Sequence, residues 1–331
     1  MPWEKAQLIE LQADATPGLW YGNLTGDGRG GLAFGSGRYV HLSPKKRNVF
    51  SKLEQMSVKA RAHVSFAHFW SVFLTTEPIL FVAVETVPPS IEIFREDQVT
   101  GSYQRVQTTD LGRAHKNSAV TAMGTISSAK GAQLAVALSS GSMVVFSKEG
   151  DSLKTVCTLT DLESPVCSVT GDATMHRGLV AASDESGKIA VWEEKSPSQF
   201  GLVFLTSLDS NYASALGLCG ALLFAGSFSG KLFLYEVDDR RLDQEVITNT
   251  RCITAIDAHT TGDMVLVAGE DCRASIFNVP MQSRQQMKLV FSVCVNGIIT
   301  GAAFTCEEPE SLDISLSVVE RHYIVQYALS S

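Results

Sequence analysis

The sequence lacks three features that would indicate particular classes of protein. Its seven cysteines include no Cys-x-x-Cys pair and no spacing typical of a metal site. No apolar run reaches the roughly 18 residues of a membrane span, and the opening MPWEKAQLIE has no apolar signal core. Lys45-Lys46-Arg47 is the only run of three basic residues, and the net charge is −8. We therefore expect no metal or other cofactor, no membrane insertion and no nucleic-acid partner.

The composition indicates a packed protein in a reducing compartment. Apolar residues make up 45% of the chain and charged residues 19%, which is ordinary for a globular fold. The cysteines are scattered, mostly in apolar stretches where a free thiol behaves as a small hydrophobe. We expect a cytoplasmic location, with association to a cytoskeletal or vesicular structure as an alternative.

One short pattern recurs along the chain and organises it. In residues 222–237 an apolar run leads through Phe228-Ser229-Gly230-Lys231 into a second alternating run, which is a hairpin signal. Similar hairpins occur at residues 134–146, 179–192 and 266–277, and weaker copies occur at residues 32–42, 80–94 and 316–327.

The spacing of these hairpins predicts the fold class. Their closing residues are separated by 52, 52, 46, 43, 42 and 50 positions: Leu42, Phe94, Phe146, Trp192, Tyr235, Phe277 and Tyr327. Periods of about 40–45 residues with four strands each are typical of β-propeller blades. Seven such units need about 280–315 residues, so the 331 residues predict an all-β, seven-bladed propeller forming a single domain over residues 1–331.

The last repeat, residues 298–327, ends after its third strand. We expect residues 6–12, a short alternating stretch, to pair with it and close the ring, because an open ring would leave an unpaired sheet edge. In blade 1 we expect strands at residues 19–24 and near 49–53. Residues 54–66 are polar and are expected to form an insertion with a helical turn.

Partial motifs carry a family resemblance. Ala114-His115 stands where a Gly-His pair would open a repeat, Asp271 lies six residues before Phe277, and Trp192-Glu193 is the nearest match to Trp-Asp. The chain thus resembles the WD-repeat (WD40) family, and further stretches extend the likeness: Trp3-Glu4, residues 183–187, Ala225-Gly226 with residues 234–236, residues 268–271 and residues 294–304. The resemblance implies a non-enzymatic WD40-type propeller that can self-associate.

The chain departs from that family at one structural position. Ser140, Ser186 and Ser229 occupy the place of the family's turn aspartate in three blades. We therefore expect no blade to build the family's full His–Asp–Ser–Trp hydrogen-bond network.

No catalytic motif stands out. The glycine-rich residues 26–31 lack the Gly-Lys-Ser/Thr ending of a phosphate loop and open no helix. His63 and His68 could be two metal ligands, but no third follows at usable spacing. Residues 183–187 match a sialidase Asp-box only partly. A triad assembled across blades stays open, because its members would meet only in space.

The candidate partner-binding residues lie on one face. In a WD-type propeller the turns between the second and third strands share the top face with the loops that enter each blade. The residues that stand out there are Glu185, Asn211, Tyr212, Phe228, Arg251, Arg273, Glu320 and Arg321. Phe228 is the sharpest candidate, because an aromatic in a short polar turn has little to pack on. Asp271 is interpreted as a turn residue, and the acidic members favour a basic peptide.

These observations favour an interaction scaffold or adaptor that binds protein or peptide partners on the top face. One alternative is a propeller enzyme with its site in the central channel, which convergent ionisable residues would favour. A channel lined by Ala122, Val169, Ala215 and Ala255 would favour the scaffold. Another alternative is a structural subunit of a larger microtubule-associated or trafficking assembly, recognisable by an apolar or charged side wall. Homo-oligomers formed through outer strands are a further alternative.

Overall fold

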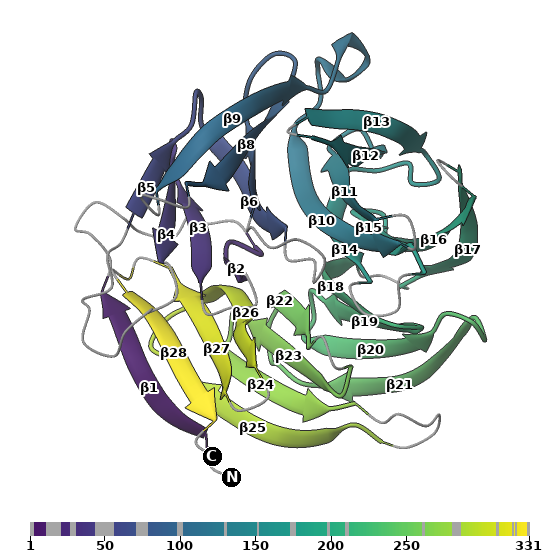
Figure 1. Cartoon of the computed structure of the whole chain (residues 1–331). Coiled ribbons are helices and arrows are strands. Elements are labelled where there is room, and N and C mark those ends of the chain that lie inside the picture. The colour runs from purple at the N-terminus through teal and green to yellow at the C-terminus, as the bar shows by residue number, and fades with distance from the viewer. Residues whose placement is uncertain are drawn as a thin grey trace.

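The structure is a computed structural model, and its strands form a ring of seven four-stranded antiparallel sheets (Figure 1). It describes residues 3–10, 21–26, 31–43, 56–70, 79–97, 102–128, 131–150, 152–172, 177–196, 199–208, 212–259, 262–279, 286–308, 311–319, 321 and 323–329. The predicted seven-bladed all-β propeller is confirmed. Within each blade the strands are named a to d from the channel outward.

The first three blades run in chain order. Blade 1 contains β2 (Thr25–Gly26), β3 (Leu32–Ser36), β4 (Tyr39–Ser43) and β5 (Met56–Lys59). Blade 2 contains β6 (Val64–Trp70), β7 (Ile79–Val84), β8 (Ser90–Glu96) and β9 (Tyr103–Asp110). A single-turn helix, η1 (Arg113–His115), precedes blade 3, which contains β10 (Val120–Ser128), β11 (Gly131–Leu138), β12 (Met143–Glu149) and β13 (Ser152–Leu159).

The next three blades repeat the same order. Blade 4 contains β14 (Val166–Gly171), β15 (Leu179–Asp184), β16 (Lys188–Ser196) and β17 (Gln199–Ser207). Blade 5 contains β18 (Ala213–Cys219), β19 (Leu222–Ser227), β20 (Lys231–Glu236) and β21 (Arg241–Ile247). Blade 6 contains β22 (Ile253–Ala258), β23 (Met264–Gly269), β24 (Arg273–Asn278) and β25 (Lys288–Cys294).

Blade 7 joins the two ends of the chain. Its inner strands are β26 (Ile299–Glu308), β27 (Ser311–Val318) and β28 (Tyr323–Leu329), and its outer strand is β1 (Trp3–Glu10). β1 pairs antiparallel with β28 from Trp3↔Leu329 to Glu10↔Tyr323, and Figure 1 shows the purple and yellow strands side by side. The predicted closure by an N-terminal strand is confirmed, although the strand begins at Trp3 rather than at residue 6.

Blade 1 requires a correction. Its outer strand is β5, which pairs Met56 with Leu42 and Lys59 with Tyr39. The expected insertion at residues 54–66 is therefore wrong, because this segment holds β5 and the start of β6. Residues 44–55 lie outside the described part, so the strand expected near 49–53 cannot be placed there. The first strand is β2 at Thr25–Gly26, later than the expected residues 19–24.

The closing residues of the repeat occupy one position in every blade. Each lies in strand c and faces a buried apolar residue of strand b: Ala33↔Leu42, Leu80↔Phe94, Leu134↔Phe146, Val180↔Trp192, Leu223↔Tyr235, Val265↔Phe277 and Ile314↔Tyr327. All seven closing side chains are buried. The repeat period thus reflects one packing position between neighbouring strands.

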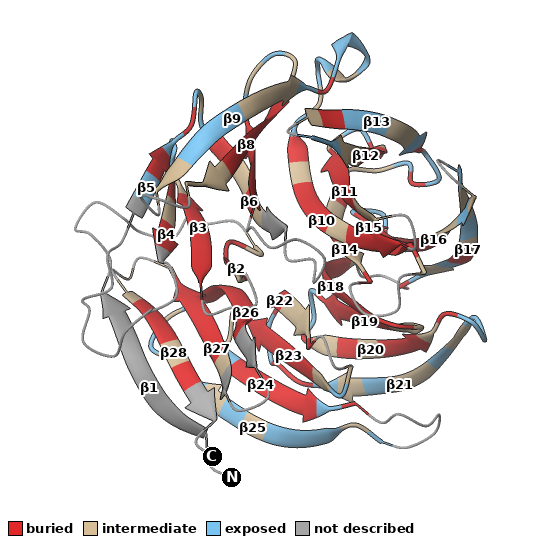
Figure 2. Cartoon of the chain, in the orientation of Figure 1, coloured by how far each residue is buried: buried red, intermediate tan, exposed pale blue. Residues whose placement is uncertain are grey.

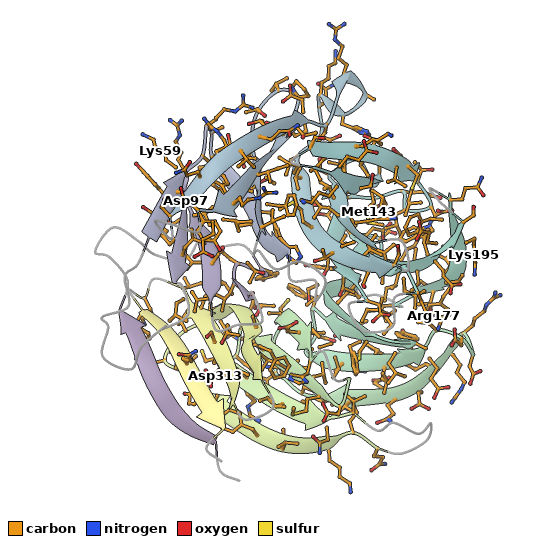
Figure 3. The ribbon with its side chains drawn as sticks, viewed as in Figure 1. Lys59, Asp97, Met143, Arg177, Lys195 and Asp313 are labelled. Carbon is orange, nitrogen blue, oxygen red and sulfur yellow. The ribbon has the colours of Figure 1, made fainter. Side chains whose placement is uncertain are left out.

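Burial follows the strand order from the channel outward. Figure 2 shows buried residues concentrated in the inner strands and exposed residues along outer strands such as β9, β21 and β25. The apolar clusters join neighbouring blades; one of them includes Val191 of blade 4 and Leu216 of blade 5. Figure 3 shows Lys59, Arg177 and Lys195 at the outer edge of the ring.

Buried hydroxyl groups add polar contacts between blades 4 to 7. Ser183 Oγ donates to the carbonyl of Ala213 at 2.7 Å. Ser214 Oγ donates to Ile253 O, and Thr254 Oγ1 donates to Ile299 O, both at 2.6 Å. Because the donors are buried, these bonds satisfy groups that water cannot reach and fix each blade against the next.

Candidate functional site

The top face is defined by the b–c turns and the d–a loops, which are joined by backbone hydrogen bonds. The amide of Glu185 donates to Pro165 O at 3.0 Å, that of Phe228 to Tyr212 O at 3.3 Å, and that of Glu270 to Cys252 O at 2.9 Å. The residue that follows strand b in each of these turns is therefore tied to the entry of strand a in its own blade. This brings side chains from turns and loops together around the channel.

The Ser-Gly turns have one backbone conformation in blades 3, 4 and 5. Gly141, Gly187 and Gly230 have φ values of 85°, 91° and 84°, in the left-handed region that favours glycine. In each turn the glycine amide donates a hydrogen bond to the carbonyl oxygen of the residue three positions earlier, at 3.0 to 3.1 Å. The turn conformation holds the exposed residues of the top face in fixed positions.

The two predicted aromatic residues of blade 5 lie against each other. The rings of Tyr212 and Phe228 have centroids 5.6 Å apart at an interplanar angle of 30°. Phe228 nevertheless remains 51% exposed. An exposed aromatic held by a neighbouring ring and by a backbone hydrogen bond is a suitable anchor for a partner.

Two carboxylates lie near this aromatic pair, one from each flanking blade. Glu185 of blade 4 is exposed, and Glu270 of blade 6 is half-buried and accepts a hydrogen bond from Tyr21 Oη at 2.5 Å. The pKa of Tyr212 is raised, first by burial, then by Cys252 and Cys167, and further by Glu185 and Glu270. The Tyr212 hydroxyl is therefore within electrostatic range of both carboxylates.

Tyr21 and Glu270 were not among the residues selected from the sequence. Burial, followed by the hydrogen bond to Glu270, raises the pKa of Tyr21 far above its ordinary value, so the phenol stays protonated and donates. Glu270 follows strand b directly, as Glu185 and Phe228 do in their blades, so aligning the turns would have found it. Tyr21 gives no such signal, because it precedes blade 1 and is 249 positions from Glu270.

The predicted arginines lie in other turns and loops than the Tyr212–Phe228 pair. Arg251 and Arg273 are exposed at the entry to blade 6 and at the start of β24. Arg321 donates through Nε to the carbonyl of Asn296 at 3.0 Å, in the loop that enters blade 7. Asn211 and Glu320 lie outside the described residues.

Asp271 has the structural role expected of it. Its carboxylate accepts hydrogen bonds from Asn249 Nδ2 at 2.7 Å and from the amides of Thr250 and Arg273 at 2.8 and 3.3 Å. Although burial acts in the opposite direction, these bonds lower the pKa of Asp271. Asp271 therefore joins the blade 6 turn to the loop that leaves blade 5.

Blade 4 uses a different aspartate that sequence reasoning missed. Asp184 is fully buried, and its Oδ1 accepts hydrogen bonds from the amides of Ser186 and Lys188, both at 3.0 Å. Trp192 Nε1 donates to Asp161 Oδ2 at 2.7 Å, outside the family's usual pattern. These contacts hold the blade without the His–Asp–Ser–Trp network.

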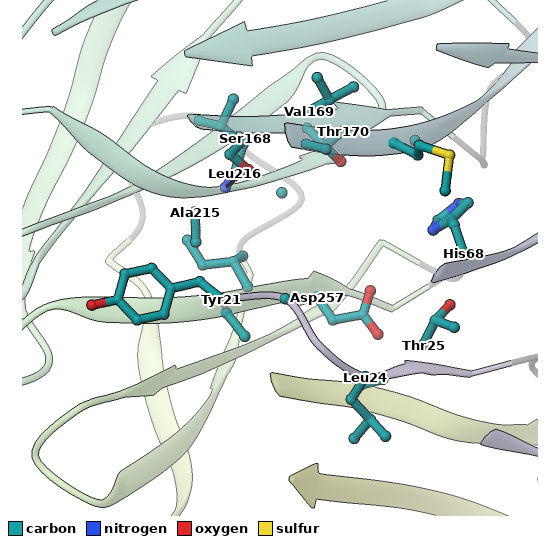
Figure 4. A pocket seen from close by; sticks show the side chains of 18 of the residues that line it. Tyr21, Leu24, Thr25, His68, Ser168, Val169, Thr170, Ala215, Leu216 and Asp257 are labelled. Atoms are coloured by element: carbon teal, nitrogen blue, oxygen red, sulfur yellow. Dashed lines mark hydrogen bonds between the residues drawn. The ribbon is translucent and has the colours of Figure 1, made fainter. Parts of the chain in front are cut away.

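The channel contains a cavity of about 220 Å³. Strand-a residues of all seven blades line it, including the four that were named from the sequence: Ala122, Val169, Ala215 and Ala255. Figure 4 shows Thr25, His68 and Asp257 in this cavity, with the Tyr21 ring directed away from them. The wall is therefore largely built from small and apolar side chains with a few polar groups among them.

The ionisable groups of the cavity have structural partners. His68 Nε2 lies 2.7 Å from Thr125 Oγ1, and burial lowers the pKa of His68 to about 4. Asp257 Oδ2 accepts a hydrogen bond from the amide of Phe304 at 2.8 Å, between blades 6 and 7. His63 pairs instead with Glu85 at 3.9 Å, and no cluster of three metal-ligating side chains occurs within the described ranges.

A family model described as WDR54 matches residues 31–315. The chain belongs to the WDR54 family. WD-repeat propellers of this kind are typically interaction scaffolds and are generally non-enzymatic. The comparison with curated proteins finds no match.

Two solved structures resemble this WDR54-family chain. A chain of the mitotic checkpoint complex aligns over 100% of this chain and 94% of its own length, with a TM-score of 0.75 and 11% identity. Chaetomium thermophilum Raptor aligns over 99% of this chain but only 29% of its own, with a TM-score of 0.71 and 14% identity. At these identities the likeness establishes the propeller fold alone. Among the residues whose placement is described, no helix is long and apolar enough to cross a membrane.

Proposed function

We propose that this WDR54-family chain is a non-enzymatic scaffold that acts as one propeller over residues 1–331. It binds protein or peptide partners on its top face. The observation that carries the proposal is the Tyr212–Phe228 pair, because Phe228 keeps 51% of its surface exposed while its backbone and ring are both held. Such a preorganised aromatic loses little conformational freedom when it is buried by a partner.

The cavity supports a scaffold over a propeller enzyme. Catalytic sites usually bring together ionisable groups whose pKa values are shifted toward the working pH. The pKa of His68 is shifted by burial and away from neutrality, and His68 contacts the Thr125 hydroxyl. The side chains of Ala122, Val169, Ala215 and Ala255 contribute no reactive group.

The cysteines support a reducing, cytoplasmic setting. The six whose side chains are described, Cys157, Cys167, Cys219, Cys252, Cys272 and Cys294, are all free thiols. Cytosolic proteins usually keep their cysteines reduced.

A second candidate function, a structural subunit of a larger assembly, is supported by the side wall of blades 4 to 6. Their outer strands expose large apolar side chains: Leu205 at 51% in β17, Ile247 at 73% in β21 and Leu289 at 59% in β25. Exposed apolar groups on neighbouring outer strands are a feature of association surfaces, including those between copies of one chain.

Blade 5 offers a matched test of the two surfaces. Phe228→Ala and Ile247→Ala each remove one exposed apolar side chain, the first from the top face and the second from the side wall. Wild type and both variants would serve as baits from native cells, with partners quantified by mass spectrometry, after all three show the same melting temperature. We expect Phe228→Ala to lose a stoichiometric partner that Ile247→Ala retains. The reverse result would support the structural subunit, and equal recovery from all three baits would contradict both.

A further inference from the structure

The aromatic pair and its neighbours form a channel mouth whose chemistry is specific. We define the channel mouth as Tyr21, Glu185, Tyr212, Phe228 and Glu270. Its members come from the segment before blade 1 and from the turns and entries of blades 4, 5 and 6. Tyr21 also lines the cavity below, together with Cys167 and Ser214. The mouth therefore combines an exposed aromatic surface with the entrance of a cavity.

The channel mouth carries two carboxylates, Glu185 and Glu270. Neither Glu185 nor Glu270 forms an ion pair with a described residue, although ten other described carboxylates lie within 4.0 Å of a lysine or arginine nitrogen, as in the Arg177–Glu193 pair at 3.0 Å. The hydrogen bond from Tyr21 occupies one oxygen of Glu270 and leaves the other available. Glu185 and Glu270 follow strand b in blades 4 and 6, the position that Phe228 occupies in blade 5, so the two carboxylates flank the aromatic pair.

These features identify the partner chemistry. A carboxylate pair repels acidic groups, and an aromatic face attracts a cation through its quadrupole. A guanidinium group suits both, since it is planar, stacks on aromatic rings and forms directed hydrogen bonds to carboxylates. Resting on the proposed top-face function, we propose that the channel mouth binds an arginine side chain of a peptide partner. The side chain stacks on Phe228, with its charge directed to Glu185 and Glu270.

The exposed arginines allow a test of whether the bound group is positively charged. Arg251 lies in the loop next to Cys252, whose carbonyl accepts the Glu270 amide, and Arg273 begins the next strand. A positive charge near the mouth opposes the binding of a second one. Arg251→Ala is therefore expected to leave the affinity for an arginine peptide unchanged or to raise it, whereas a general docking surface that uses Arg251 would lose affinity.

The experiment uses a random-peptide library displayed on phage and selected against the intact wild-type chain. Enriched peptides are then synthesised with arginine or with citrulline, which keeps the shape and lacks the charge. Their affinities are measured for wild type, for Glu185→Gln/Glu270→Gln, for Arg251→Ala and for Phe228→Ala, each shown to be folded by its melting temperature. We expect the selected peptides to contain arginine. Their affinity should fall about tenfold or more when citrulline replaces the arginine and when the double glutamine variant replaces wild type, and it should fall with added salt.

Other outcomes separate the two proposals. Peptides that need Phe228 but contain no arginine, that bind the glutamine variant equally well or that prefer lysine would overturn the arginine site and leave the top-face scaffold in place. Selection of no peptide whose binding depends on Phe228, Glu185, Glu270 or Arg251 would overturn both.

Discussion

Blades 5 and 6 build the same b–c turn from different residues. In blade 5 the turn is Ser227-Phe228-Ser229-Gly230, and in blade 6 it is Gly269-Glu270-Asp271-Cys272. The backbone bonds match: Gly230 N donates to Ser227 O at 3.1 Å, and Cys272 N donates to Gly269 O at 3.2 Å. Both turns also accept backbone hydrogen bonds from the loop that follows strand d. The acceptor is Gly230 O in blade 5 and Cys272 O in blade 6.

The side chains that hold the two turns differ. Blade 5 uses Ser227, which is fully buried and accepts a hydrogen bond from the Lys231 amide at 3.0 Å. Blade 6 has glycine at that position, and the Asn249 amide group takes the space, 2.7 Å from where a Cβ on Gly269 would lie. Asp271 accepts from the amide of Arg273 at the start of strand c, as Ser227 accepts from Lys231 in blade 5, and it also accepts from Asn249 of the neighbouring loop.

This difference explains why degenerate repeats still form regular blades. The turn requires a backbone conformation and an acceptor for the start of strand c, and several side chains satisfy the second requirement. Loss of the family's turn aspartate in blades 3 to 5 therefore does not imply loss of the turn.

The largest effect is expected from Gly230→Ala in blade 5. A Cβ there would lie 2.2 Å from the carbonyl oxygen of Asn249, and φ is 84°, so the change combines a backbone clash with left-handed strain. We expect a loss of about 3 kcal/mol or more in the free energy of unfolding, measured by urea denaturation.

Gly37→Ala is the matched control for this prediction. Gly37 lies in the b–c turn of blade 1 with a φ of 59°, and a Cβ there would have nothing within 4 Å. It should cost only about 1–2 kcal/mol, from backbone strain alone. Equal losses for the two variants would show that the contact with Asn249 does not constrain the turn.

A smaller effect is expected from Asp271→Ser, which gives blade 6 the residue found in blade 5. The Asp271 carboxylate accepts three backbone or amide hydrogen bonds, and we expect the variant to lose about 1–2 kcal/mol at pH 7. Because the pKa of Asp271 is lowered on folding, its contribution is present above the ordinary carboxyl pKa of about 4 and is lost as the pH falls through the folded value. The difference between wild type and variant should therefore shrink in acid.

Ser227→Ala in blade 5 controls for general acid destabilisation. It removes the equivalent acceptor, which does not titrate, so its cost should be similar at pH 7 and at pH 3.5. A difference between wild type and Asp271→Ser that stayed constant over this range would argue against the charged form as the source of stability.

The repeat pattern allowed the fold to be predicted because the repeated residues occupy positions that the backbone geometry of each blade requires. The closing residues mark the same register in every blade, and the Ser-Gly pairs mark the left-handed turn residue. The outer strand of blade 1 was expected near residues 49–53, whereas the described outer strand is Met56–Lys59. A polar segment there looked like an insertion because outer strands face solvent and carry little apolar signal.

The site could be predicted only in part. Phe228 was selected because an aromatic lies in a short polar turn, and Glu185 and Tyr212 were selected from their places in a b–c turn and a d–a loop. The Tyr21–Glu270 contact joins residues 249 positions apart, and Asp161 meets Trp192 from a loop, so neither pairing has a local signal. Long-range contacts of this kind follow from ring closure and blade packing rather than from any one repeat.

The smallest effect is expected from Cys272→Gly, which removes the difference between the two turns at their last position. Cys272 has a φ of 65°, so a residue with a Cβ occupies the conformation that glycine takes in blades 3 to 5. Relief of left-handed strain, about 1–2 kcal/mol, exceeds the extra freedom that glycine gives the unfolded chain, about 0.4–1 kcal/mol. We expect a gain of roughly 0.5–1 kcal/mol in the free energy of unfolding. Cys272→Ala removes the thiol but keeps the strain, so it should give no such gain; if alanine stabilises as much as glycine, the thiol and not the backbone conformation accounts for the difference between blades 5 and 6.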